Sequence, residues 1–294
     1  MESKLVSIVM LSWNRKDDVL YSLAQIRKNQ YKNLEVIVCD NGSTDGTIEE
    51  IKAKFPEVKL IEVGDNLGIA GYNYGFEEAN GEYILIIDDD SFPALDAVGK
   101  MVEKFEDEPD LGVVAFDVRN AKEYNGAVSQ NKQVDKTPYE YYMGFNGAGA
   151  GVRKELFKKV GYYPSEFFLY MNEADCAIRI WDEGYKIKFF PEIISYHKQA
   201  EKNRTAWRAA FYYTRNSFWV LWKNYPLQLC VKRSLILTFY CFYSSIEQHT
   251  MIYIKALFSA IFKSKLLNGK RRPVSLDIAS KMRIPLNLPF TFYN

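Results

Sequence analysis

Apolar, β-branched runs recur along the first 118 residues with the spacing of one strand and one helix. Amphipathic segments with helix-start signals separate them, such as Asp17-Asp18 before the segment 19–29. The apolar runs lie at residues 5–13, 34–40, 58–64, 83–88 and 111–118. Near-continuous apolar strands that alternate with helices predict a doubly wound α/β domain, with a parallel sheet covered on both faces. Ligands of such sheets gather at the carboxyl ends of the strands, where Asp40 and the run Asp88 to Asp90 fall.

The pattern changes after residue 118. The segment 119–150 is polar and glycine-rich and predicts a loop region that faces the active site, with an irregular strand at most. Later patterns predict helices at 152–160 and 173–184, a pair of strands at 185–190 and 193–197, and a mostly helical stretch from residue 203 to about residue 262 that breaks near Pro226. We therefore expect a body of residues 1–202, made of halves 1–118 and 119–202, and a helical tail of residues 203–294.

Composition excludes several classes of protein. With 294 residues, of which 48% are hydrophobic and 26% charged, the chain can bury a large core, and disorder is not expected. The four cysteines lack the spacing of metal ligands, which predicts free buried thiols and neither a disulfide framework nor a structural zinc. The first residues lack the pattern of a signal peptide, so a cytoplasmic protein is expected.

The net charge of +1 hides a strong asymmetry. Residues 203–294 contain 14 Lys and Arg but only two acids, for a charge of +12, which leaves −11 for residues 1–202. A basic tail of this kind predicts an anionic partner, either lipid or nucleic acid. Its longest uncharged run within 227–262 is the 13 residues Ser234 to Ile246, shorter than the roughly 18–20 needed to cross a bilayer. Together with its many aromatic residues this favours a helix at an anionic membrane surface, with no nucleic acid partner; packing against the body or a homo-oligomer contact is the alternative.

Three consecutive aspartates, Asp88 to Asp90, follow an apolar strand. Like charges at a strand end repel one another, and a divalent cation among them removes that repulsion. A hard, oxygen-rich site suits Mg²⁺ or Mn²⁺, and substrate phosphates commonly complete the coordination of such ions. The triplet therefore indicates a metal site for a nucleotide diphosphate, and a solvated acidic turn is the alternative.

Seven segments follow one another in the order of a known family: residues 6–15, 34–47, 65–75, 81–91, 147–161, 172–197 and 211–216. They resemble the family-2 glycosyltransferases of GT-A fold, and specifically their bacterial rhamnosyltransferase-like and galactofuranosyltransferase-like members. The resemblance implies a Rossmann-like α/β catalytic domain with a C-terminal helical extension. It also implies inverting, metal-dependent transfer from a UDP- or dTDP-sugar, dTDP-rhamnose first, to a glycan or a polyprenyl-lipid-linked acceptor. Such an enzyme would be peripheral on the inner face of the cell membrane.

The resemblance also assigns residues. The nucleotide-binding set is Ser12, Arg15, Asp40, Asn66, Gly71, Asn73, Asp88 and Asp89. Within it, Asp40 would accept the imino proton of a uracil or thymine ring, and Asp88 or Asp89 would lie on the ribose side. Asp90 and His197 would hold the cation, with Mn²⁺ favoured over Mg²⁺ because imidazole suits the softer ion. The alternatives are a turn aspartate at Asp40, a surface charge at Arg15 and a packed histidine at His197.

The catalytic base is expected at Glu173, with Asp175 next in line. Family members usually show two adjacent acids followed by an aspartate two residues later and an arginine four residues beyond it. Alignment on Asp175 and Arg179 places Glu173 on the second acid, whereas Asn172 replaces the first. The alternative is that Glu173 and Asp175 are only a helix cap and first-turn charges.

Three other classes of protein are weighed against this one. A nucleotidyltransferase should carry a glycine- and arginine-rich loop after the first strand, and the segment 12–18, SWNRKDD, is not such a loop. A nicotinamide enzyme should carry GxGxxG there. A non-catalytic binding protein, or one with a vestigial nucleotide site, would account for the basic tail but not for the acidic triplet together with Asp40, Glu173 and His197.

Overall fold

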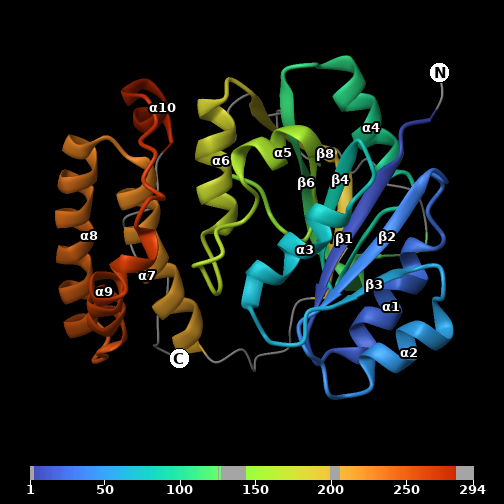
Figure 1. Cartoon of the computed structure of the whole chain (residues 1–294), viewed down its shortest axis with the longest axis horizontal. Helices are drawn as coiled ribbons and strands as arrows, with labels where there is room; N and C mark the ends of the chain where they lie inside the picture. Colours follow the sequence, from blue (N-terminus) through green and yellow to red (C-terminus); the bar gives the residue numbers. More distant parts are fainter. Residues whose placement is uncertain (1–2, 125, 127–143, 199–205, 283–294) are drawn as a thin grey trace.

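The structure, a computed structural model, describes residues 3–124, 126, 144–198 and 206–282. One eight-stranded sheet crosses the N-terminal body in the order β3-β2-β1-β4-β7-β6-β8-β5 (Figure 1). Its strands are β1 (Val6–Ser12), β2 (Leu34–Asp40), β3 (Lys59–Glu62), β4 (Tyr83–Asp88), β5 (Ser91–Pro93), β6 (Leu111–Asn120), β7 (Ala150–Arg153) and β8 (Lys186–His197). The helices of this body are α1 (Lys16–Ile26), α2 (Thr47–Lys54), α3 (Tyr72–Glu78), α4 (Ala97–Asp107), α5 (Lys154–Val160) and α6 (Asn172–Asp182).

The sheet is mixed, whereas a parallel sheet was expected. Strands β3, β2, β1 and β4 are parallel, but β7 runs antiparallel to both β4 and β6, and β5 runs antiparallel to β8. The predicted strands 185–190 and 193–197 are one strand, because β8 continues through Pro191 with a shift of register against β6. A proline lacks the N–H that a sheet ladder needs, and such an irregularity accommodates it.

Each face of the sheet is covered by helices, as predicted. Alternate residues of a strand point to opposite faces, so Ile8 and Met10 pack with α1, α2 and α4. Val9 and Ile86 pack on the other face with α3, α5 and α6. The α/β architecture expected from the apolar runs is therefore confirmed.

The C-terminal part is helical, as expected. It consists of α7 (Ala206–Asn224), α8 (Leu227–Glu247), α9 (Ile252–Phe262) and α10 (Leu276–Lys281). The predicted break at Pro226 separates α7 from α8, since proline cannot continue the hydrogen-bond ladder of a helix. In Figure 1, α7 lies beside α6, and α8 is the layer farthest from the sheet. None of the helices within the described residues is long and apolar enough to cross a membrane.

Some expectations fall partly or wholly outside the described residues. The irregular strand expected in 119–150 is partly seen as the end of β6, but residues 127–143 are not described. The boundary at 202/203 also lies outside them, so the division into two domains stays a prediction. All four cysteines are buried and free, as predicted.

Candidate active site

The carboxyl ends of three neighbouring strands bring predicted site residues together. In the register of the sheet, Ser12 at the end of β1 pairs with Asp40 at the end of β2. On the other side of β1, Leu11 pairs with Asp88 at the end of β4. The three strands are parallel, so their polar ends meet at one edge of the sheet, as a ligand site in this kind of fold requires.

The acidic triplet and His197 meet because β5 turns back beside β8. Ser91 pairs with His197 in the sheet, and the backbone N–H of Lys198 donates to the Asp90 carbonyl over 2.8 Å. His197 Nε2 lies 2.9 Å from Asp90 Oδ1 and 3.8 Å from Asp88 Oδ2. Among the described residues, Asp88, Asp90 and His197 form a group whose ligand atoms all lie within 4.8 Å of one another.

This group fits a divalent cation by its chemistry. Two carboxylates and one imidazole are ligands that suit Mn²⁺ and, less well, Mg²⁺. Burial opposes the ionisation of Asp90, but the hydrogen bond from His197 and the charges of His197 and Arg15 outweigh it and hold the pKa of Asp90 below its usual value. The carboxylate of Asp90 therefore stays charged, as a metal ligand must be.

Arg15 offsets much of the repulsion within the triplet. Its guanidinium lies 3.0 Å from Asp89 Oδ1 and 2.8 Å from Asp90 Oδ2, and it also pairs with Asp18 over 2.8 Å. Asp89 thus faces Arg15 and is not part of the group of three possible ligands. Burial nevertheless raises the pKa of Asp89 to about 8, against the opposing charge of Arg15.

Asp40 lies fully buried at the end of β2 and also serves the turn that follows. Its Oδ1 accepts from the Ser43 N–H over 2.6 Å, and its Oδ2 accepts from the Ser43 hydroxyl over 2.7 Å. The buried hydroxyl of Ser12, in register with Asp40, has no hydrogen-bond partner in the described part of the chain. A carboxylate accepts about four hydrogen bonds, so Asp40 keeps capacity for another donor.

The remaining predicted nucleotide residues shape the loop after β3. Asn66 Oδ1 accepts from the Gly68 N–H over 3.0 Å, and Asn73 binds both backbone polar groups of Tyr163, over 2.9 and 3.1 Å. At Gly71 a Cβ atom would lie 2.2 Å from Asn41 Oδ1, so any other residue there would require the Asn41 side chain to move. These residues hold the loop against the site from one side.

Glu173 faces the acidic cluster from α6. A Cβ atom on Gly147 would lie 3.0 Å from Glu173 Oε1 and 3.9 Å from Asp88 Oδ1, so the backbone of Gly147 borders both carboxylates. Burial, with a further contribution from the charge of Asp88, raises the pKa of Glu173 to about 7. A carboxyl group with this pKa can take up a proton near neutral pH, as a general base must.

Asp175 is placed away from Glu173, because two residues along a helix turn the side chain by roughly 200°. It is fully buried and pairs with Arg179 over 2.8 Å and with Lys223 over 3.2 Å, and it accepts from Asn224 Nδ2 over 2.7 Å. Lys223 also pairs with the buried Glu166 over 2.9 Å. Asp175 thus joins α6 to α7.

Several neighbours of the site were missed from the sequence. The Tyr72 hydroxyl contacts the Ile87 carbonyl over 2.8 Å and Asp88 Oδ1 over 3.1 Å, and the backbone of Gly147 borders the carboxylates of Glu173 and Asp88. Both lie in segments that carried the family resemblance, so that signal was available. Lys223 had only a weak signal, as a single charge in an aromatic helix.

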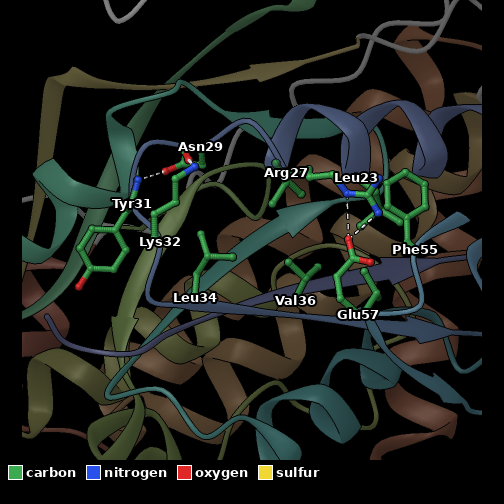
Figure 2. A pocket seen from close by; sticks show the side chains of 11 residues that line it. Leu23, Arg27, Asn29, Tyr31, Lys32, Leu34, Val36, Phe55 and Glu57 are labelled. Carbon is green, nitrogen blue, oxygen red and sulfur yellow. Dashed lines mark hydrogen bonds and ion pairs between the residues drawn. The ribbon is translucent and has the colours of Figure 1, made fainter.

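A separate pocket lies at the N-terminal end of β2, away from Asp40 (Figure 2). Leu34 and Val36, from the first half of the strand, line it together with residues of α1 and the segment after α2. Arg27 lies 4.4 Å from the Phe55 ring and donates to Glu57 over 2.6 Å. Because Asp40 marks the other end of the strand, this pocket is not part of the candidate site.

Curated relatives are glycosyltransferases. The probable glycosyltransferase YdaM of Bacillus subtilis is 23% identical over 251 residues, which are 76% of this chain and 59% of YdaM. A poly-beta-1,6-N-acetyl-D-glucosamine synthase of Staphylococcus epidermidis is 22% identical over 262 residues, which are 85% of this chain and 63% of the synthase. The chain therefore spans less than two thirds of the length of these relatives.

Solved structures share the fold. The mannosyltransferase PcManGT from Pyrobaculum calidifontis, solved with GDP-Man and Mn²⁺, matches with a TM-score of 0.58 and 21% identity over 74% of this chain and 62% of that one. S. aureus TarS 1–349, solved with UDP-GlcNAc, matches with a TM-score of 0.58 and 16% identity over 74% and 64% of the two chains. At these identities the likeness shows the GT-A fold alone.

The family model for glycosyl transferase family 2 matches residues 7–175. None of the relatives cited above is named a rhamnosyl- or galactofuranosyltransferase, so that subtype stays a prediction. The family match favours sugar transfer over the nucleotidyltransferase and over the non-catalytic binding protein. Because the match covers more than half of the chain, this protein belongs to glycosyltransferase family 2, and its fold is GT-A.

Proposed function

We propose that the protein transfers a sugar, with inversion, from a UDP- or dTDP-sugar to a hydroxyl group of a cell-surface glycan or a polyprenyl-lipid-linked acceptor. One observation carries the proposal: Glu173 and the metal-capable group Asp88, Asp90 and His197 lie at one edge of the sheet, and the backbone of Gly147 borders both Glu173 and Asp88. A base and a diphosphate site next to each other are what glycosyl transfer needs.

The nucleotide base is proposed to lie at Ser12 and Asp40. The buried carboxylate of Asp40 accepts only from Ser43 in the described structure and has capacity for the imino N–H of uracil or thymine. dTDP-rhamnose is the first donor to test, and a UDP-hexose or UDP-galactofuranose follows. GDP-mannose belongs in the comparison as well, because PcManGT is solved with that nucleotide sugar.

Asp88, Asp90 and His197 are proposed to hold Mn²⁺, or Mg²⁺ in its place. When bound there, such an ion supplies positive charge that stabilises a departing diphosphate. Arg15 pairs with Asp90 over 2.8 Å and so helps to hold one member of the ligand group in place.

Glu173 is proposed as the general base. Its carboxylate takes the proton of the acceptor hydroxyl while that oxygen forms a bond to the anomeric carbon. The bond between the anomeric carbon and the diphosphate oxygen breaks on the opposite face, so the configuration inverts and a nucleoside diphosphate leaves. The Glu173 pKa of about 7 suits this proton transfer at neutral pH.

The place of action is proposed from charge. The basic tail of +12 favours an anionic membrane surface, on its inner face, where a polyprenyl-linked acceptor would be met. No nucleic acid partner is proposed, and a homo-oligomer is kept as an outcome to be tested.

The test is nucleoside-diphosphate release from UDP-, dTDP- and GDP-sugars with Mn²⁺, Mg²⁺ or EDTA, in the presence of membranes as a source of acceptor. We expect metal-dependent release from one uracil- or thymine-linked donor. Glu173→Gln should keep donor binding and lower transfer by about 10²–10⁴-fold. The matched control is Glu155→Gln, which changes an exposed glutamate in the first turn of α5. No release from any donor, together with no nucleotide binding, would overturn the proposal, and full transfer by Glu173→Gln would move the base elsewhere.

A further inference from the structure

Helix α8 exposes its large apolar side chains. Seven of them are between 46% and 75% exposed, and together we call them the α8 apolar face: Leu227, Val231, Leu235, Phe239, Phe242, Tyr243 and Ile246. The side that packs inward buries Leu237 and otherwise small or polar residues, namely Cys230, Cys241, Ser244 and Ser245. Surface helices ordinarily bury their apolar stripe and expose their polar one.

The α8 apolar face is continuous. Its first four members follow one another at intervals of four residues, which places them on one side of a helix. From Leu227 to Ile246 the face runs for roughly 29 Å at 1.5 Å per residue. Exposed apolar side chains that stand alone are normal on proteins, but a contiguous patch of this size marks an interaction site.

The face lies at the periphery of the molecule. Within the described residues α8 packs against α7 and α9, and in Figure 1 it is the layer farthest from the sheet. At the end of α9, Phe258 and Phe262 stack with ring centroids 5.9 Å apart and are 48% and 76% exposed. Apolar exposure is thus concentrated on the outer helices of the extension.

The charge around this face indicates what covers it. Exposed lysines and arginines lie on and beside α8 and α9, including Lys232, Lys255, Lys263, Lys265 and Arg272. Between the start of α8 and the end of α10, the exposed acidic residues are Glu247 and Asp277. Asp277 pairs with Lys281 over 2.6 Å. Two copies joined through α8 would bring like charges together, whereas anionic lipid headgroups would compensate them.

We infer that the α8 apolar face docks into the headgroup boundary of an anionic membrane, with the helix lying in the plane of the surface and the basic residues beside it contacting lipid headgroups. The inference deepens the proposed function and rests on it for its purpose, because a lipid-linked acceptor is met at such a surface. The binding itself depends only on α8 and its neighbours.

The test uses the full chain and sedimentation with vesicles of phosphatidylglycerol and phosphatidylcholine, and with vesicles of phosphatidylcholine alone. Wild type should bind the anionic vesicles more strongly, and added salt should weaken the binding. The variant L235S/F239S removes two large side chains that are 66% and 63% exposed and should lower partitioning by about 10- to 100-fold. The control is Leu276→Ser, since Leu276 is 59% exposed on α10, outside the α8 apolar face, and should leave binding unchanged.

Three results would overturn the inference. Wild type that does not bind anionic vesicles rules out the membrane, and L235S/F239S that binds like wild type rules out this face. If wild type does not bind vesicles but elutes as a dimer, and L235S/F239S elutes as a monomer, the face is a contact between two copies of the chain. Nucleotide affinity measured in solution should be unchanged by L235S/F239S, so a failure of the donor site is distinguished from a failure of membrane docking.

Discussion

Two acids on the first turn of α6 should respond oppositely to neutralisation. Asp175 is fully buried among Arg179, Lys223 and Asn224, and Glu173 faces the cluster of Asp88. The perturbations are Asp175→Asn and Glu173→Gln, which keep the shape of each side chain and remove its charge.

Asp175→Asn should destabilise the fold by about 3 kcal/mol, because removing one member of a buried ion pair leaves the other charges uncompensated. Burial opposes the ionisation of Asp175, but the charges of Arg179 and Lys223 and the Asn224 hydrogen bond lower its pKa. A lowered carboxyl pKa stabilises the fold above the unfolded value of about 3.9, and this contribution is lost as pH falls through the folded value. The gap between wild type and Asp175→Asn should therefore be constant near neutral pH and shrink in acid.

Glu173→Gln should change the free energy of unfolding in the opposite direction. The pKa of Glu173 is raised to about 7, so its ionised form is disfavoured in the folded protein and lowers stability increasingly from about pH 4.3 to pH 7. At pH 8 the glutamine variant should be as stable as wild type or more stable.

The assay is urea unfolding at pH 3, 6 and 8 without metal or nucleotide, with the free energy of unfolding compared between the three proteins. The electrostatic explanation fails if Asp175→Asn is as stable as wild type at pH 6, or if Glu173→Gln is less stable than wild type at pH 8. An equal loss in both variants would mean that both acids serve the fold alone.

The remaining predictions concern transfer and metal binding. The rate of transfer should fall about tenfold per pH unit below pH 7 as Glu173 becomes protonated, and a flat acid limb of the pH profile would contradict its role as the base. Gly147→Ala places a methyl group 3.0 Å from Glu173 Oε1 and should lower kcat by about 10- to 100-fold, whereas an unchanged kcat would show that the contact does not matter. His197→Ala and Asp90→Asn should each weaken Mn²⁺-dependent binding of UDP in a calorimetric titration, and unchanged Mn²⁺ affinity would argue against a shared ion.

Much of the N-terminal half could be predicted from the sequence. Apolar runs reveal buried strands, and a strand's carboxyl end is fixed by where the run stops, so the meeting of Ser12, Asp40 and Asp88 followed from local patterns. The pairing direction of β7 could not be read in this way. This strand has only four residues in a glycine-rich stretch, and periodicity reports burial but not which neighbour a strand pairs with.

The meeting of Asp90 and His197 was expected only through the family resemblance, because residue patterns alone do not show that β5 pairs with β8. The contact of Asp175 with Lys223, 48 positions along the chain, was not predicted from the sequence. Spacing places Glu173 and Asp175 on one helix, but it does not say which of them faces the sheet edge. That difference depends on α7, whose own register against α6 is a property of tertiary packing.

Helix α6 connects the N-terminal body with the helical C-terminal part of the chain. Its first turn presents Glu173 to the acidic cluster, while Asp175, on another side of the same turn, is held by Lys223 and Asn224 of α7. The position of the proposed base is therefore set in part by the helical extension, which also carries the α8 apolar face. An extension that docks on a membrane would hold the sheet edge at a defined height above the lipid surface. The ion pairs of Asp175 with Arg179 and Lys223 are directional and would restrict the orientation of α6 against α7.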